Sequence, residues 1–258
     1  MEHLPINWVN GLKLTANHFF GNYHSVMESL YRSTEERLTD YNYGLGKSFD
    51  NSNENVEFAI NGESLDTLSV RLKMCNAITR SGLPVLFYEG LYGDYVPTAT
   101  LTDKNPLPMD DNSYLILVAV NPNKLIPVGE PDPEEVPLHH PYVLPHIDLH
   151  LLPKVQVNKT FYNKNFLVIG EIKTHGNTFS IDRQYIPPLQ KAAHHDGVKV
   201  FISQLTHTLH AIKEDIRLIY SRNLSDKRRD VLANNTFILC EAFTGFYDRH
   251  IFFIEQIA

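Results

Sequence analysis

Residues 198–219 read VKVFISQLTHTLHAIKEDIRLI, and the spacing of their apolar side chains decides the C-terminal part of the fold. The intervals alternate between four and three residues through Val198, Ile202, Leu205, Leu209, Ile212, Ile216 and Ile219. This heptad pattern places the apolar side chains in one stripe along an α-helix, as is typical of helices that pack on other helices. The stretch therefore predicts a helix with an unbroken packing seam.

A second helix is predicted after a short turn at residues 223–226, where Ser225 or Asp226 is suited to cap its start. Its seam has the same four-and-three spacing, at Leu232, Thr236, Leu239, Phe243, Phe246, His250, Phe253 and Ile257. Two helices joined by a short turn form an antiparallel hairpin, which covers each helix on one side only. Further helices, from this chain or from other subunits, are therefore needed to cover Phe237, Ile238, Ile251, Phe252 and Ile254.

The residues ahead of the hairpin favour β-strands, after a helix expected at residues 23–38. Strand-like segments occupy residues 56–60, 68–78, 81–90, 113–122, 142–153, 165–172 and 178–188. In residues 68–78, apolar and polar residues alternate, which predicts a strand with one buried face. The side chains expected on that face are Leu68, Val70, Leu72 and Met74. The continuous apolar run in 113–122 predicts a strand buried on both faces. The expected fold class is α+β, with an N-terminal β domain with a leading helix at 1–188 and a helical hairpin or bundle domain at 192–258.

Residues 121–145 contain seven prolines, at positions 122, 127, 131, 133, 137, 141 and 145, with four acidic residues among them. So many missing N–H donors argue against a helix or a central strand. We interpret the segment as an extended arm or a long surface loop. A solvated loop and an arm that wraps a partner both remain open, since loops of this length are often functional.

The composition narrows the class of protein. The net charge of −7 over 258 residues, with residues 227–229 as the one basic run, argues against nucleic-acid binding. Two distant cysteines indicate free thiols in a reducing compartment rather than a disulfide framework. We see no signal peptide and no apolar run near the ~18 residues that a membrane span needs. We therefore expect a cytoplasmic protein without direct membrane insertion.

The histidines supply the strongest candidate for chemistry. His146, Asp148 and His150 alternate, so on a strand their side chains share one face and could ligate a metal ion. The alternative is a strand with its polar face in water or at an interface, because apolar residues fill the positions between them. The sequence has no G-x-S-x-G motif and no catalytic cysteine motif. We expect no enzyme, no cofactor and no metal site, with a metal-dependent enzyme as the least favoured alternative.

The N-terminal stretch WVNGLKLTANHF, residues 8–19, resembles the N-terminal signature of TssK, the baseplate subunit of bacterial type VI secretion systems. The matching residues are Trp8, Gly11, Leu14, His18 and Phe19. Asn10 replaces the usual glutamate, and Ala16 and Asn17 replace a Pro-Gln pair. These departures indicate a divergent branch of the family, such as a Bacteroidota type.

Further landmarks follow in the order that the family shows. GLGKSFD at 44–50 corresponds to a glycine-containing strand, and CNAITRSGLPV at 75–85 to a segment ending in a glycine turn. PVGEPDPEEVPLHHP at 127–141 resembles the family's proline-rich stretch, and YIPP at 185–188 its link to the helical domain. The resemblance therefore covers most of the chain.

The resemblance implies a β-sandwich similar to the shoulder of siphophage receptor-binding proteins, then a helical bundle that trimerises. The family's C-terminal head, which docks on the membrane complex, is expected to be absent here. The implied function is that of a homotrimeric structural adaptor, at the inner face of the inner membrane, which links baseplate wedge subunits to the membrane complex. Trp8, Gly11, Leu14, His18 and Phe19 would contact other wedge subunits, and the seam from Val198 to Ile219 would serve oligomerisation. The alternative is a phage-tail receptor-binding or adaptor protein.

Overall fold

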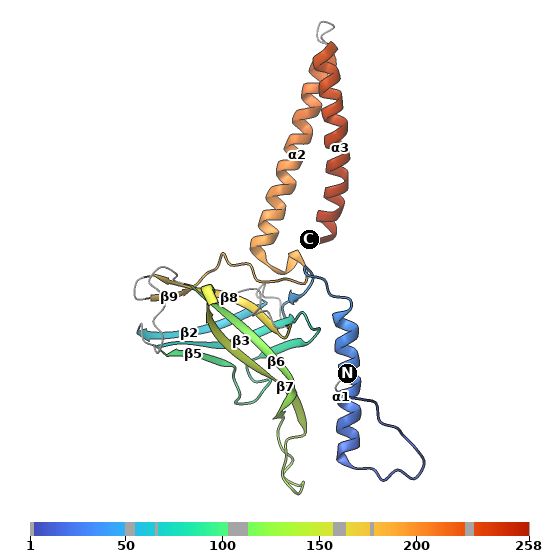
Figure 1. Ribbon diagram of the computed structural model, residues 1–258. Coiled ribbons are helices and arrows are strands. Elements are labelled where there is room, and N and C mark those ends of the chain that lie inside the picture. Colours follow the sequence, from blue (N-terminus) through green and yellow to red (C-terminus); the bar gives the residue numbers. More distant parts are fainter. Residues whose placement is uncertain are drawn as a thin grey trace. The chain divides into compact units, whose positions relative to one another are not determined.

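The computed structural model describes residues 3–49, 55–64, 67–102, 113–156, 164–175, 178–224 and 230–257. The chain divides into two compact units, Met1–Gln190 and Lys191–Ala258. The first unit contains two antiparallel sheets and one helix, and the second contains a pair of long helices (Figure 1). The fold class is therefore α+β, as predicted.

The first sheet is built around one long strand, β3. Its strands are β1 (Gly44–Leu45), β2 (Val56–Ser64), β3 (Thr67–Ile78), β4 (Pro84–Tyr88) and β5 (Thr98–Thr102). Cys75 of β3 pairs with Val56 of β2 and with Phe87 of β4, so these two strands lie on opposite sides of β3. β5 was not predicted, because its sequence TATLT has little apolar content.

The alternation predicted for β3 holds for only part of the strand. Leu68, Val70 and Leu72 are fully buried, but Met74 is only half-buried and Cys75 is buried in its place. The reason is a β-bulge, since the register against β2 shifts by one residue at Lys73. One extra residue turns every later side chain to the opposite face.

The second sheet has the order β7-β6-β8-β9. Its strands are β6 (Ser113–Val128), β7 (Tyr142–Pro153), β8 (Phe166–His175) and β9 (Thr178–Ile181). Ile116 and Val118 of β6 join a core that also contains side chains of the first sheet, whereas Leu115 and Leu117 pack in a second cluster on the other face. The prediction of a strand buried on both faces is confirmed.

The interpretation of residues 121–145 as an extended arm or a long surface loop holds for 129–141, but not for 121–128 and 142–145, which are strands. β6 and β7 extend into the two ends of this segment and form a paired ribbon there, in which Leu125 faces Pro145 and Val128 faces Tyr142. Beyond Ala119, the pairings of β6 among the described residues are all with β7, so each ribbon strand has a side on which a proline needs no strand partner. The ribbon extends below the sheets in Figure 1.

The helices are α1 (Ala16–Glu35), α2 (Asp196–Leu224) and α3 (Asp230–Ile257), with short 3-10 turns at Lys154–Gln156 and Ala192–His194. α1 begins seven residues before the predicted start at 23. α2 and α3 form an antiparallel pair (Figure 1), while the predicted caps Ser225 and Asp226 and the basic run 227–229 lie outside the described residues. None of the helices in the described ranges is long and apolar enough to cross a membrane.

Candidate interaction surfaces

The start of α1 is fixed by two residues of the N-terminal signature region. The N–H of Thr15 donates a hydrogen bond to Nδ1 of His18 at 3.2 Å, and the Thr15 hydroxyl lies 2.8 Å from the same atom. The His18 N–H in turn donates to the Thr15 carbonyl at 3.1 Å. His18 thus takes the place of the Glu or Gln that closes a capping box, which explains why the helix starts at Ala16.

A turn brings Trp8 back to this helix start. The N–H of Leu12 donates to the carbonyl of Val9 at 3.2 Å, and Gly11 has φ +85°, which favours glycine. The ring of Trp8 then lies 6.4 Å from that of His18, centre to centre. The structure therefore gathers Trp8, Gly11 and His18 around the first turn of α1.

The apolar members of the signature point away from the chain's own core. Trp8, Leu14 and Phe19 are each at least half exposed, at 50%, 56% and 59%. Aromatic rings anchor many protein interfaces, because they bury much area with few rotatable bonds. The exposure of these three side chains supports an interface at this place.

An N-terminal arm, residues 3–8, runs back along one face of α1. The His3 N–H donates to the carboxylate of Glu28 at 2.9 Å, and the His3 ring stacks on that of His24 at 4.8 Å. A Cβ on Gly21 would lie only 3.1 Å from Cδ1 of Ile6, so glycine permits this close approach. The arm braces α1 on one face and leaves another face free.

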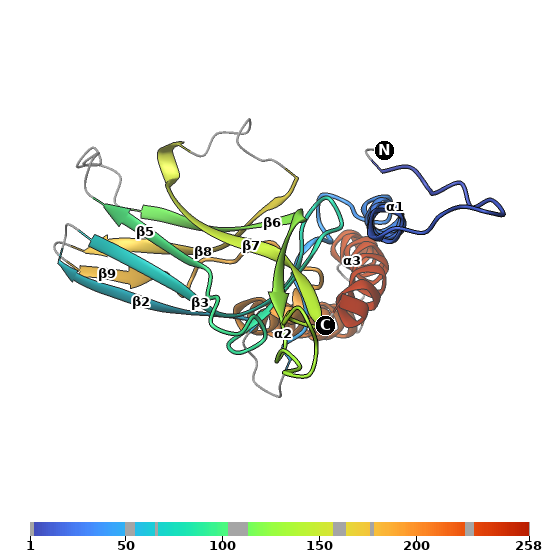
Figure 2. The same cartoon turned by 90° about the horizontal axis from the view of Figure 1, so that it is seen from below.

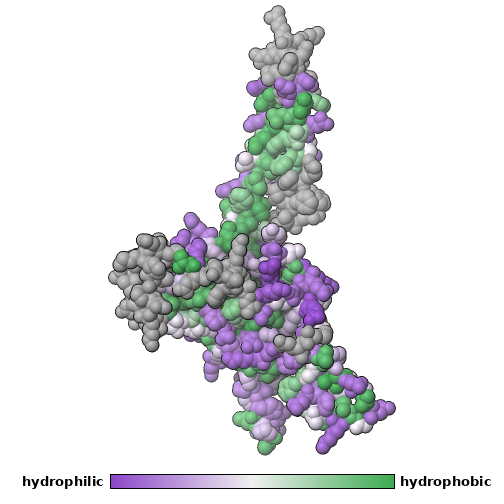
Figure 3. All heavy atoms as spheres, in the orientation of Figure 1, coloured by the Kyte–Doolittle hydropathy of each residue, from purple (hydrophilic) through white to green (hydrophobic). Residues whose placement is uncertain are grey.

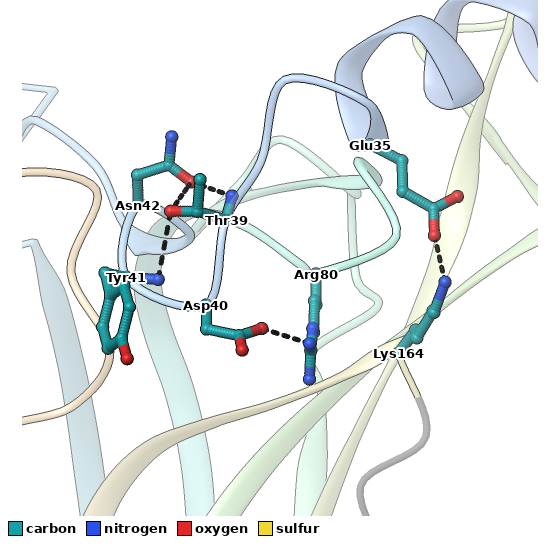
Figure 4. Close-up of polar contacts among 7 residues, drawn as sticks. All are labelled: Glu35, Thr39, Asp40, Tyr41, Asn42, Arg80 and Lys164. Atoms are coloured by element: carbon teal, nitrogen blue, oxygen red, sulfur yellow. Dashed lines mark hydrogen bonds and ion pairs between the residues drawn. The ribbon is translucent and has the colours of Figure 1, made fainter.

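The C-terminal end of α1 is anchored on the β unit. Tyr31 packs against the main core, and its burial raises the pKa of its hydroxyl. Gly82, in the turn between β3 and β4, lies so close that a Cβ there would meet the Tyr31 carbonyl oxygen at 2.5 Å. Ion pairs between Lys164 and Glu35 and between Arg80 and Asp40 add to this contact (Figure 4).

A cleft of about 390 Å³ lies between α1, the N-terminal arm and the β turns. Most of its lining is polar or ring-bearing, from His3, Tyr23, His24, Met27, Glu28, Tyr31, Arg32, Glu35, Ser81, Pro122, Asn123 and Asn165. Two of these residues are hydrogen-bonded to each other, since the Ser81 hydroxyl donates to Oδ1 of Asn165 at 2.7 Å. Such a lining is poorly suited to bind an apolar side chain.

The heptad seam of α2 divides into two halves. Leu209 and Ile216 are buried, and Ile202 is half-buried, whereas the alternate positions Leu205, Ile212 and Ile219 are 36–50% exposed. A single partner helix covers only one side of a seam, so half of the apolar positions remain in contact with solvent. Figure 3 shows green, hydrophobic residues along the visible face of this hairpin.

On α3 the buried face differs from the predicted one. Tyr247 is buried, with its hydroxyl 2.8 Å from the ring nitrogens of His210 and Lys213 Nζ 4.1 Å above its ring. Two residues of the predicted seam, Leu239 and Phe246, are exposed, and Phe246 directly precedes Tyr247. The side chains of the other predicted seam residues on α3, apart from half-buried Phe243, lie outside the described residues, namely Leu232, Thr236, His250, Phe253 and Ile257. In the described part of α3, the packed face therefore includes Tyr247 with its polar contacts, beside half-buried Phe243 of the predicted seam.

The strand that suggested a metal site forms a hydrogen-bonded network instead. His146 is buried, its Nδ1 lies 3.0 Å from Asp148, and its Nε2 lies 2.9 Å from Lys124 Nζ and 3.2 Å from the Tyr95 hydroxyl. The Tyr95 hydroxyl donates to the carbonyl of Ile147 at 2.6 Å. Burial, and then the charge of Asp148, raise the pKa of Tyr95. Both nitrogens of His146 are therefore engaged by protein groups.

His150 is separate from this network, because it is exposed and its ring lies 5.6 Å from Phe166. Within the described ranges no group of three or more His, Cys, Asp or Glu side chains is placed to hold a metal ion. The network ties the bulged part of β6 to β7, and we assign it a structural role.

Comparisons with models of known protein families and with curated proteins found no match. Solved structures do match. A crystal structure of TssK superposes with a TM-score of 0.59 at 16% identity, over 97% of this chain and 55% of the TssK chain. The baseplate complex from the type VI secretion system matches with 0.57 at 17% identity, over 95% and 79% of the two chains. The cryo-electron microscopy structure of the TssK–TssF–TssG baseplate subcomplex matches with 0.56 at 16% identity, over 100% and 81%.

These matches confirm that the chain has a TssK-like fold. They cover both compact units, since nearly the whole chain takes part. At 16–17% identity the likeness concerns the fold, and the chain spans only about half of the TssK chain in the first match.

Proposed function

We propose that this chain is a structural component of a type VI secretion baseplate, a homotrimeric adaptor that binds neighbouring wedge subunits. The observation that carries the proposal is the agreement of a TssK-like fold over 97% of the chain with large apolar side chains left exposed on both compact units. Exposed apolar patches of this kind are typical of surfaces that are covered by another protein. No catalytic role is part of the proposal.

Each predicted domain has its own role in this proposal. Residues 1–188 would form a β-sandwich of the phage receptor-binding shoulder type, whose two sheets share the main core. Residues 192–258 would form a trimerisation bundle. The support is the TssK-like fold together with the presence of two sheets and one helical pair.

The wedge contact would involve Trp8, Gly11, Leu14, His18 and Phe19. Three of these side chains are at least half exposed, and the other two set the backbone and the helix start that present them. Aromatic anchors at an interface often contribute about 2 kcal/mol or more each. In one matched structure TssK is assembled with TssF and TssG, so proteins of those two types are the partners we propose.

The trimer contact would involve the α2 seam, divided between two tasks. Val198, Ile202, Leu209 and Ile216 would hold the hairpin together, and Leu205, Ile212 and Ile219 would pack on other copies. Leu239 and Phe246 of α3 are exposed as well and would face the same neighbours. Aliphatic side chains at heptad spacing are well suited to such a bundle.

The proposed site of action is the cytoplasmic face of the inner membrane. The family resemblance assigns the link to the membrane complex to a C-terminal head domain, so that link is a prediction of the resemblance alone. Assembly into a baseplate would bring the chain to that membrane face.

Two measurements test the proposal. Sedimentation of the purified chain should give about three times its mass of 29.6 kDa, and co-expression with TssF- and TssG-type proteins from the same genome should yield one complex. A monomer at micromolar concentration would overturn the trimer, and failure to co-purify with either protein would overturn the baseplate role. Trp8→Ala, with Tyr41→Ala as an exposed aromatic control, should weaken co-purification.

A further inference from the structure

The apolar surface at the start of α1 continues along the helix beyond the signature residues. Phe19, Tyr23, Val26 and Leu30 are 39–59% exposed and are spaced by four, three and four residues. This spacing places them on one face of the helix, and we call these four residues the α1 stripe. The stripe spans 11 helical steps, or about 17 Å at about 1.5 Å each.

Within the described residues of the first unit, the contacts that hold α1 lie on its other faces. The N-terminal arm packs on a different face, through the contacts of His3 with His24 and Glu28 and of Ile6 with Gly21. The β unit holds the end of the helix through Tyr31 and Gly82. These contacts hold α1 from two directions, and within the described residues of the first unit the stripe stays exposed, with Tyr23 at its edge also lining the cleft.

The exposed area is large enough to form most of one side of an interface. The stripe and its neighbours Trp8, Leu14 and Phe20 are seven side chains that are each about half exposed. At about 150–200 Å² for each side chain, they offer roughly 600 Å² of apolar surface. A stable interface buries about 800 Å² on each partner.

The composition of the stripe indicates the kind of surface that receives it. The α2 seam is aliphatic, as suits helices packing on copies of themselves, but the α1 stripe with Trp8 and Phe20 is mainly aromatic. Rings of this size need pockets, and the cleft beside α1 on this chain is mostly polar. The receiving groove is therefore expected on another protein.

We propose that α1 binds as a helix in an apolar groove on a wedge subunit of a different sequence, with the α1 stripe as its row of anchors. This inference rests on the proposed baseplate function and extends the wedge contact from the signature to Val26 and Leu30. In such complexes the residues at i, i+4, i+7 and i+11 of one face enter the groove together, and the flanking polar residues remain at its rim.

The test uses the full chain and the purified TssF–TssG-type pair as the probe. Val26→Asp and Leu30→Ala should each weaken binding at least tenfold, because both side chains would be buried in the groove. Asn22→Asp, which adds the same charge on the exposed flank of α1, should change the dissociation constant by less than about twofold. The side chains of Val26 and Leu30 are half exposed, so the circular dichroism spectrum and the melting temperature of these two variants should be unchanged.

Each outcome separates the two proposals. If the wild-type chain binds the pair and Val26→Asp and Leu30→Ala bind equally well, the α1 groove is wrong and the baseplate role stands. If the wild-type chain does not bind, both are overturned. If Val26→Asp lowers the sedimenting mass of the chain alone, a second copy covers the stripe and the assignment to a different protein is wrong.

Discussion

Nδ1 of His18 accepts from the backbone N–H of Thr15 and lies 2.8 Å from the Thr15 hydroxyl, so one imidazole closes the first turn of α1. The bond from the Thr15 N–H needs a lone pair of Nδ1 directed at Thr15, whereas the hydroxyl can either donate or accept. This role explains a histidine at the third helical position, where glutamate or glutamine is usual in a capping box. His18 is thus a structural residue within a surface that we propose as an interface.

The cap makes a specific prediction for two substitutions. His18→Ala removes the acceptor and should destabilise the first unit by about 1 kcal/mol, whereas His18→Gln keeps an acceptor and should lose less than half of that. Denaturant unfolding measures the loss, and hydrogen exchange at residues 16–19 locates it. If the glutamine variant is as unstable as the alanine variant, the histidine acts through packing and not as a cap.

A glycine decides how α1 joins the β unit. Gly82 has φ +79°, and a Cβ there would lie 2.5 Å from the Tyr31 carbonyl oxygen and 2.9 Å from the Glu35 nitrogen. Gly90 has a similar φ of +91° but open space around it, which makes it a matched control. Gly90→Ala should cost about 1–2 kcal/mol from backbone strain alone.

Gly82→Ala should cost at least 1 kcal/mol more than Gly90→Ala, because the helix end must also move. The melting temperature measures the total, and faster hydrogen exchange along α1 should appear in the Gly82 variant only. Equal losses in the two variants would mean that α1 does not depend on this close approach.

Local periodicity accounts for the parts of the fold that could be predicted. The strands at 68–78 and 113–122 and the two long helices have strong patterns of period two or 3.6, so their existence and type were clear. The resemblance of residues 8–19 to a known signature predicted the TssK-like fold. The exposed state of Trp8 and Phe19 was not predictable, because a ring near a terminus packs inward as readily as outward.

The missed features depend on single residues or on distant partners. The bulge at Lys73, which turns Met74 outward, comes from pairing with β2. The prolines in the ribbon strands, 121–128 and 142–145, do not interrupt a sheet, because among the described residues this part of β6 pairs with β7 and not with β8. Which positions of the α2 seam are buried depends on how many helices pack around α2, and that number cannot be predicted from the sequence of a single chain.

The divided seam predicts two different phenotypes for the same chemical change. Leu209→Asp with Ile216→Asp places carboxylates inside the hairpin, at a cost of several kcal/mol, and should unfold α2 and α3. Leu205→Asp with Ile212→Asp changes half-exposed positions, so the hairpin should stay helical while the assembly dissociates to monomers. Circular dichroism and sedimentation distinguish the pairs. Identical behaviour of the two double variants would contradict the division of the seam.

Two buried groups predict a loss of stability at alkaline pH. Burial raises the pKa of the Cys75 thiol from 9.0 to about 12, and burial followed by the nearby Tyr95 raises the pKa of Tyr92 from 10.0 to about 12. At pH values between the ordinary and the raised pKa, both groups stay neutral in the folded chain but ionise in the unfolded chain. Their contribution to stability is therefore complete below pH 9 and is lost as the pH rises through 12, by up to about 1.4 kcal/mol per pH unit for each group.

Variants that lack the Cys75 thiol measure how much this thiol contributes to the change of unfolding free energy with pH. Cys75→Ala and Cys75→Val differ in how well they fill the core, so their free energies of unfolding at pH 8 should differ from each other and from that of the wild type. Because neither variant has a thiol to ionise, both should lose stability between pH 9 and 11 less steeply than the wild type, and by the same amount as each other. Urea unfolding at several pH values gives these slopes. A wild-type slope in both variants would show that the thiol is already accessible to hydroxide in the folded chain, contrary to its complete burial.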